Sequence, residues 1–171
     1  MNNLRRCQWA CDALLIDYHD HEYGKIITDD NKLFEKFSLE VFQAGLSWRT
    51  VLAKRDYFRE VFFNFKIDAV AALADGYLES LLLDQRIIRN RKKIFATRQN
   101  ALSTQKIIAG GPTFFQFVYS FSNHKKLCLA LKKSGFTFIG DTMVESFMQS
   151  VGILPAHEPC CFLYRQQSCE V

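Results

Sequence analysis

Long apolar runs, internal repeats and low-complexity segments are all missing from this sequence of 171 residues. Because no N-terminal stretch is apolar enough for a signal peptide or a transmembrane helix, we expect a cytoplasmic protein without a membrane partner. Alternation of apolar and polar residues, which indicates half-buried strands, is nearly absent too. The sequence therefore predicts an all-α fold, and residues 136–139 are the only candidate for an extended segment.

Acidic residues are missing from a long part of the chain. Between Gln85 and Gly140 there are 11 Lys and Arg and no Asp or Glu, whereas the remaining residues hold 11 basic and 18 acidic side chains. A positive region of this kind suits a polyanion, because each phosphate contact releases condensed counterions. We favour a nucleic-acid partner, and the alternative is a basic surface that only serves solubility.

Hydrophobic residues make up 49% of the composition, and 16 residues are Phe. This content excludes a disordered chain and predicts a core built on aromatic packing. The length is typical of one domain, so we expect residues 1–171 to form a single helical domain.

Apolar spacing and capping residues place the expected helices. These helices cover residues 30–44, 48–62, 69–74, 76–83, 89 to beyond 102, 113–121, 125–133 and 142–150. The residues expected to cap them are Asp29 or Asp30, Ser47, Asp68, Asp75, Thr113 and, as a capping box for the last helix, Thr142 with Glu145.

Two cysteines and two histidines lie near the two ends of the sequence. Cys7 and His19 are near the start, and His157 and Cys161 stand four positions apart near the end. Two Cys and two His are the ligand set of a closed, structural zinc site, which has no open position for catalysis. Such a site would fasten both termini of a small domain.

The spacing of these residues does not by itself establish that they bind zinc. Cysteines in a reducing compartment are free thiols or metal ligands before they are disulfides. The alternative is therefore a set of buried free thiols and ordinary surface histidines. Cys11 and Cys160 also compete as ligands, because each is close in sequence to a favoured cysteine.

A group of aromatic residues surrounds one acidic residue in the first third of the chain. Trp9, Tyr18, Tyr23 and Trp48 offer flat rings on which a base can stack. Glu40 lies in a mostly apolar stretch, so it is either buried for a purpose or exposed on its helix. The alternative is a solvated glutamate and two tryptophans that only fill the core.

A basic segment lies between two expected helices at residues 81–94. A short turn there would point the start of the second helix outward, where backbone N–H groups and the helix dipole favour a phosphate. Arg89, Arg91 and Lys92 add positive charge. This pattern resembles a helix-hairpin-helix DNA element, although basic helix starts are also common on solvated faces.

Four stretches, in this order, resemble a single family. They are CQW at 7–9 with YHDHEYG at 18–24, LEVFQAGLSW at 39–48, IIRNR at 87–91, and LKKSGF at 131–136 with FIG at 138–140 and SFMQ at 146–149. Together with His157 and Cys161, they resemble the bacterial 3-methyladenine DNA glycosylase I (TAG) family. The resemblance implies a helix-hairpin-helix glycosylase fold with one structural zinc ion.

The resemblance also implies roles for individual residues. The zinc ligands fall on Cys7, His19, His157 and Cys161, and the base pocket falls on Trp9, Tyr18, Glu40 and Trp48, with Tyr23 where the family usually has Trp. Gly45 and Leu46 lie at a helix junction from which Leu46 can wedge into the DNA stack. The hairpin residues expected to bind DNA are Arg89, Asn90, Arg91 and Lys92.

The implied activity is hydrolysis of the N-glycosidic bond of 3-methyladenine in double-stranded DNA that contains alkylated bases. Methylation leaves the adenine positively charged, so the bond is already weak and no strong general acid is needed. The base is flipped into the pocket, where Tyr18 and Trp48 are expected to sandwich it and Glu40 to accept a hydrogen bond from it. No lysine is placed as a nucleophile, so we expect a monofunctional enzyme, acting as a monomer.

The sequence departs from the family pattern at several places besides Tyr23. Gln85-Arg86 stands where a small residue and Gly are expected, Glu145 stands where an aromatic is usual, and the segment after His124 is shortened. A Gly would serve a left-handed turn, so Gln85-Arg86 predicts a strained or differently bent hairpin. The alternatives are a DNA-binding relative with impaired catalysis or, less favoured, an unrelated zinc-stapled interaction domain.

Overall fold

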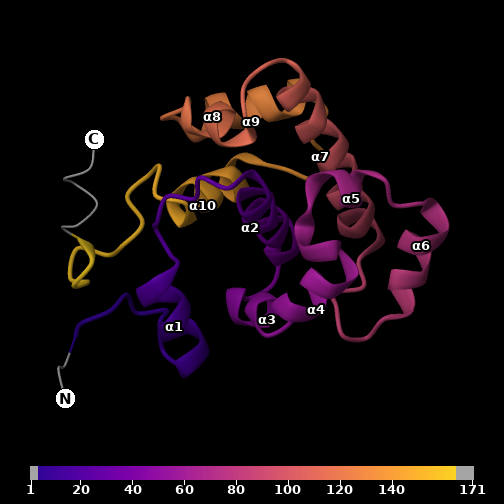
Figure 1. Cartoon of the computed structure of the whole chain (residues 1–171). Helices are drawn as coiled ribbons and strands as arrows, with labels where there is room; N and C mark the ends of the chain where they lie inside the picture. The colour runs from indigo at the N-terminus through magenta and orange to yellow at the C-terminus, as the bar shows by residue number, and fades with distance from the viewer. Residues whose placement is uncertain (1–3, 165–171) are drawn as a thin grey trace.

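The computed structural model describes residues 4–164, and its regular structure is entirely helical (Figure 1). No strand occurs in that part of the chain, so the all-α prediction is confirmed. Residues 136–139 are irregular instead of extended, because Phe138 has a φ of 56° that interrupts the backbone run. The α-helices are α1 (Ala13–His21), α2 (Asp30–Gln43), α3 (Trp48–Leu52), α4 (Arg55–Val61), α5 (Ile67–Ala71), α6 (Asp75–Ser80), α7 (Arg91–Ala109), α8 (Phe114–Tyr119), α9 (His124–Lys133) and α10 (Asp141–Ser150), and two 3₁₀ turns are η1 (Phe63–Phe65) and η2 (Leu81–Leu83).

Helix α2 forms the centre of the core and packs against α3, α7, α8, α10 and η1. Its predicted apolar residues Leu33, Phe34, Phe37 and Val41 are fully buried. Phenylalanines dominate the packing around it: the Phe37 and Phe147 rings meet edge to face with their centroids 5.1 Å apart. Each aromatic side chain removes a large apolar area from water, so these rings account for much of the core's stability. The aromatic core predicted from composition is confirmed.

Several predicted helix starts are confirmed by hydrogen bonds. The side chain of Asp29 accepts from the N–H of Lys32, and that of Ser47 accepts from the N–H of Thr50. Thr113 forms a reciprocal capping box with Gln116. These bonds satisfy N–H groups that have no partner within the helix.

Other predicted caps are wrong. Asp68 and Asp75 lie inside the first turns of α5 and α6. There their charge favours the helix dipole without capping it. Thr142 and Glu145 form no capping box, because α10 already begins at Asp141, after Gly140, and has no side-chain cap.

Boundaries also differ from the predicted ones. The helix expected over residues 48–62 is divided into α3 and α4 by the turn at Ala53 and Lys54. The long helix begins at Arg91 instead of near Arg89, because the side chain of Asn90 accepts from the N–H of Lys93 and caps it. Helix α1 was not predicted, although Asp12 caps it by accepting from the N–H of Leu15.

The two ends of the described chain lie on the same side of the molecule (Figure 1). The N–H of Phe162 donates to the carbonyl of Arg5 at 2.8 Å, and the N–H of Gly24 donates to the carbonyl of Ser150 at 3.0 Å. Gly152 has a φ of +76°, and a Cβ there would lie 2.6 Å from the carbonyl oxygen of Gly24. Only glycine permits this approach, which brings the segment after α10 against the segment after α1.

None of the helices in the described part of the chain has the length and hydropathy that a membrane crossing requires.

Candidate functional site

A cavity of about 350 Å³ opens between α1, α2, α3 and α10. Cavities of this size, with apolar walls and a few polar groups, are typical of small-ligand sites. The structure brings Trp9, Tyr18, Tyr23, Glu40 and Trp48 together here, as the sequence predicted. The complete lining is Trp9, Leu15, Tyr18, Tyr23, Glu40, Gln43, Ser47, Trp48, Arg49, Ser146 and Gln149.

Glu40 is buried in this cavity on the inner face of α2, with only 4% of its surface exposed. Burial raises the pKa of its carboxyl, and the nearby ammonium of Lys36 opposes that rise. The alternative of a solvated glutamate on an amphipathic helix is therefore wrong. A buried carboxylate that faces a cavity is a strong acceptor and a source of negative potential for a ligand.

The aromatic walls touch one another. The ring centroids of Tyr18 and Trp48 are 5.3 Å apart, with the planes tilted by 50°. A flat base between two parallel rings would need roughly 7 Å between their centroids, since each contact takes about 3.5 Å. The two rings as placed here form one continuous wall, so a sandwiched base would require them to move apart, and the sandwich stays a prediction.

Trp9 and Tyr23 extend this wall toward the end of α1. Their rings meet edge to face with centroids 5.0 Å apart. Tyr23, which stands where the family usually has Trp, is half-buried and still lines the cavity. The smaller ring therefore preserves the aromatic contact.

Lys36 lies beside the pocket and contacts its walls, and the sequence reasoning missed it. Its ammonium lies 3.6 Å from the carboxylate of Glu40, four positions later on α2, and donates to the hydroxyl of Tyr18. The same nitrogen lies 4.1 Å from the ring centroid of Trp48. The sequence could have indicated this contact, because Lys36 and Glu40 are four positions apart and therefore share a helix face.

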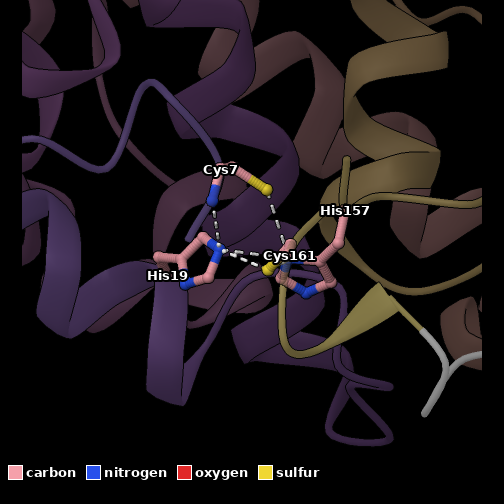
Figure 2. Close-up of side chains that lie close together, drawn as sticks. All are labelled: Cys7, His19, His157 and Cys161. Carbon is pink, nitrogen blue, oxygen red and sulfur yellow. Dashed lines mark hydrogen bonds between the residues drawn. The ribbon is translucent and has the colours of Figure 1, made fainter. Parts of the chain in front are cut away.

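The four predicted metal ligands Cys7, His19, His157 and Cys161 converge at the end of the molecule where the termini meet (Figure 2). Their nearest atoms are 3.2–3.6 Å apart in four pairs, and all lie within 4.8 Å of one another. Tetrahedral zinc with S and N ligands at its usual bond lengths separates donor atoms by about 3.3–3.8 Å. The geometry of this cluster therefore fits one such ion.

The competing cysteines lie elsewhere. Cys11 and Cys160 are exposed and outside the cluster, whereas Cys7 and Cys161 are buried in it. Residues 157–161 form a turn, closed by a bond from the N–H of Cys161 to the carbonyl of Glu158 at 2.8 Å. This turn brings His157 and Cys161 to the same point.

Groups around the cluster orient its donors. The Nδ1 of His19 lies 2.8 Å from Asp20, whose carboxylate is in turn held by Arg6 at 2.7 Å. That bond leaves Nε2 of His19 directed at the other three ligands, as in carboxylate–histidine–metal arrangements. Backbone N–H groups of Glu158 and Leu163 donate to the sulfurs of Cys7 and Cys161. Such donors favour thiolates.

The protonation states of the cluster also suit a cation. Burial raises the pKa of the Cys7 thiol to about 11, so its thiolate would be costly without a positive charge nearby. Burial and the neighbouring His19 lower the pKa of His157, which favours the neutral imidazole that binds metals. The four residues can therefore hold a metal ion.

The cluster and the cavity share their aromatic side chains. The ring of Trp9 lies 5.3 Å from that of His19, and the ring of Tyr23 lies 5.3 Å from that of His157. The pocket wall thus rests on the metal-ligand residues, so the order of the cluster and the shape of the pocket are coupled.

The turn between α2 and α3 carries Gly45 and Leu46 at the rim of the cavity. Gly45 has a φ of +79°, a conformation that other residues rarely adopt. The N–H of Leu46 donates to the carbonyl of Gln43 at 2.7 Å, and 41% of the Leu46 surface is exposed. The turn therefore presents an apolar side chain to solvent next to the pocket, where the sequence predicted a wedge.

The hairpin at residues 81–94 runs from η2 into α7. Arg89, Asn90, Arg91 and Lys92 are all exposed at the start of α7. Arg91 is already engaged, because it pairs with Glu79 at 2.5 Å. A phosphate at this residue would have to compete with that carboxylate.

The replacement of a small residue and Gly by Gln85-Arg86 does not strain the hairpin. Neither residue has a positive φ. Their carbonyl groups accept hydrogen bonds from Lys54, and Arg86 pairs with Asp84 and Glu60. The turn is therefore bent without a left-handed residue, and the expected strain is wrong. The shortened segment after His124 is closed in a similarly regular way, because Asn123 caps α9.

The acid-free segment is less positive in the fold than in the sequence. Arg86, Arg91 and Arg98 pair with acids that lie before residue 85. Lys93 is buried and donates to carbonyl oxygens. Tertiary contacts thus neutralise part of the charge on which the nucleic-acid interpretation rested.

A helical fold with an aromatic pocket around a buried carboxylate, an exposed leucine on the turn beside it and a basic segment before α7 has features of a base-flipping DNA glycosylase. The Methyladenine glycosylase family profile matches residues 8–129 and 122–164. The chain belongs to this family.

Curated relatives and solved structures agree with this assignment. DNA-3-methyladenine glycosylase 1 of Escherichia coli (strain K12) is 41% identical and the alignment covers 94% of this chain and 97% of that protein. The DNA-3-methyladenine glycosylase of Haemophilus influenzae is 38% identical, with 91% and 96% covered. A crystal structure of 3-methyladenine DNA glycosylase I (TAG) superposes with a TM-score of 0.89 at 39% identity, covering 94% of this chain and all of that one. A TAG from Staphylococcus aureus, studied for 3-methyladenine recognition, gives 0.88 at 28% identity, with 94% and 97% covered.

Proposed function

We propose that this protein is a monofunctional DNA glycosylase of base-excision repair that releases 3-methyladenine from alkylated double-stranded DNA. The observation that carries the proposal is Glu40, a carboxylate buried in a cavity of about 350 Å³ whose walls are aromatic. The names of the relatives supply the substrate. Action as a monomer and a cytoplasmic location stay predictions.

Cleavage of the glycosidic bond requires little from the protein beyond binding of the base. A 3-methylated adenine in DNA carries a positive charge, so it is already a good leaving group. Glu40 would accept a hydrogen bond from the base and favour that charge, and the wall of Tyr18 and Trp48 would stack on one face of it. As the bond from the sugar carbon to the base breaks, its electron pair moves to the base nitrogen. Water then adds to the sugar carbon and loses a proton to solvent.

Base flipping would use the rim of the pocket. Leu46 would enter the gap that the flipped nucleotide leaves, and the turn at Gly45 would approach the backbone. Arg89, Asn90, Arg91 and Lys92 would hold phosphates at the start of α7, where N–H groups and the helix dipole favour anions.

The ion we propose for the Cys7, His19, His157 and Cys161 cluster is one structural zinc. The two sulfurs and two nitrogens, their spacing and the Asp20 contact to His19 support this choice over harder metals, which prefer oxygen ligands. Four protein ligands leave no open position, so zinc would stabilise the pocket wall through Trp9 and Tyr23 without acting on the base.

A DNA-binding relative with impaired catalysis is the second candidate. The observation that favours it is the ion pair of Lys36 with Glu40 at 3.6 Å, which neutralises the carboxylate in the pocket. The experiment that separates the two candidates is incubation of zinc-loaded protein with methylated duplex DNA, followed by chromatography of the released bases. Release of 3-methyladenine that falls in Glu40→Gln supports the enzyme. Binding of DNA without release, from folded protein, would establish the impaired relative instead.

A further inference from the structure

Lys36 lies behind the aromatic wall of the base pocket, outside the pocket itself. A second cavity, of about 590 Å³, is lined by Lys36 and shares Tyr18 and Trp48 with the base pocket. The ammonium of Lys36 lies 4.3 Å from the ring centroid of Tyr18 and 4.1 Å from that of Trp48. The same two rings therefore face the base pocket and a buried cation.

The surroundings of Lys36 leave Glu40 as its main counter-charge. Only 8% of Lys36 is exposed. The other charged groups that act on it are Glu22 at the end of α1 and Arg55 on α4. These two pair with each other at 2.6 Å, so they largely cancel. Burial lowers the pKa of Lys36 to about 8, which still leaves most molecules charged at neutral pH.

A cationic base and the Lys36 ammonium would be stabilised by the same groups. Both are stabilised by the carboxylate of Glu40 and by the ring faces of Tyr18 and Trp48. Two like charges that share one carboxylate repel each other, and solvent screens the repulsion only partly because the site is mostly buried. An uncharged base has the same shape and hydrogen-bonding edge but does not meet this repulsion.

We propose, resting on the proposed base-binding function, that Lys36 sets the charge preference of the pocket by pairing with Glu40 and covering the rings of Tyr18 and Trp48. The pocket is then close to electroneutral, and its preference for a cationic purine over an uncharged one is reduced. Lys36 is a specificity-determining residue that acts through Glu40 without touching the base, and the ligand class it favours is the uncharged purine.

The test compares two ligands that differ in charge. Free 3-methyladenine is uncharged near neutral pH, and 3,9-dimethyladeninium keeps the positive charge that the nucleotide has in DNA. Dissociation constants for both are measured near pH 7 by titration calorimetry with wild type, Lys36→Met and Lys36→Arg. In Lys36→Met, the ratio of cation affinity to neutral-base affinity rises roughly tenfold, as one nearby charge in a partly screened site implies. In Lys36→Arg the ratio stays near that of the wild type.

Two further variants guard against indirect effects. Lys32→Met makes the same charge change at an exposed site of α2, and it leaves the ratio unchanged. Lys36→Gln replaces Lys36→Met if the latter does not fold. Equal changes in the affinities of both ligands would show that Lys36 only supports the fold, and an unchanged ratio would also overturn the inference. If the wild type binds neither ligand, the proposed base pocket is refuted. That result differs from one in which both ligands bind but the affinity ratio is the same in wild type and Lys36→Met.

Discussion

The ammonium of Lys93 on α7 lies 2.6 Å from the carbonyl oxygen of Ala44, at the end of α2. It also donates to the carbonyl of Phe42 at 2.7 Å. A cation at this position satisfies carbonyl groups that lack partners at a helix C-terminus and complements the helix dipole. The hairpin helix thus holds the turn that presents Gly45 and Leu46, so the two elements proposed to contact DNA are fixed relative to each other.

Lys93→Met is expected to loosen this link. The substitution leaves two carbonyl oxygens without their charged donor and should lower the free energy of unfolding by about 3–6 kcal/mol, since each of the two bonds to a charged group contributes about 1.5–3 kcal/mol. Urea unfolding measures the effect. Lys106→Met, an exposed lysine on the same helix, is the matched control and should change stability little. Equal effects of the two substitutions would contradict the proposed anchor.

Leu46→Ala is expected to impair excision from duplex DNA more than binding of a free base. The truncation removes the apolar side chain proposed to fill the emptied stack, so flipping becomes less favourable by about 1–2 kcal/mol, the value of a buried leucine surface. Single-turnover excision should fall about 5- to 30-fold, a range that follows from that energy. The affinity for free 3-methyladenine should not change.

Leu129→Ala is the control for this prediction, because Leu129 is 59% exposed on α9. It should leave both measurements unchanged. A loss of free-base affinity in Leu46→Ala would mean that Leu46 shapes the pocket, and the wedge would be refuted.

Removal of the metal is expected to destabilise the protein and open its pocket. Elemental analysis should find one zinc per chain, and Cys7→Ser should abolish it. A bound ion raises the free energy of unfolding by about 4 kcal/mol when the free metal concentration is roughly 1,000-fold above its dissociation constant, and removal of the ion loses this stabilisation. A chelator should therefore lower the melting temperature, and excision should decline with it because Trp9 and Tyr23 pack on the ligands.

The exposed cysteines serve as controls for the metal site. Cys11→Ser and Cys160→Ser should retain both the ion and the wild-type melting temperature. Retention of zinc in Cys7→Ser together with its loss in Cys160→Ser would show that the ligand set is different.

Stability above neutral pH should report on the buried Lys36. Its pKa is about 8 in the folded protein and 10.5 for an ordinary lysine. Between these values the unfolded chain holds more protons than the folded one, so the free energy of unfolding rises with pH. From about pH 8 to pH 10, wild type should gain about 1–2 kcal/mol relative to Lys36→Met, which lacks this titration.

The same comparison with Lys32→Met controls for the loss of a lysine charge. That variant should follow the wild type across the range, because Lys32 is exposed. If the free energies of unfolding of wild type and Lys36→Met changed with pH in parallel, burial would not lower the pKa of Lys36.

Local sequence determined much of what the structure shows. Helix α2, its caps and its buried face follow from the spacing of Leu33, Phe34, Phe37 and Val41 and from Asp29. The four metal-ligand residues and the aromatic set around Glu40 could be selected from residue types and from the resemblance to a family. These features depend on side chains close in sequence or on motifs whose residue types are specific, so they can be read without a fold.

Tertiary structure decided the features that depend on residues distant in sequence. The burial of Glu40 follows from helices that close over α2, whereas its own helix pattern was compatible with exposure. The contact between the rings of Tyr18 and Trp48 depends on how α1 and α3 pack, which the sequence pattern does not encode. The charges of Arg91 and Arg98 are paired with acids of another helix, Glu79 and Asp75. Lys36 reached Tyr18 and Trp48 only because three helices meet there, and electrostatic energy depends on distances in space that sequence separation does not encode.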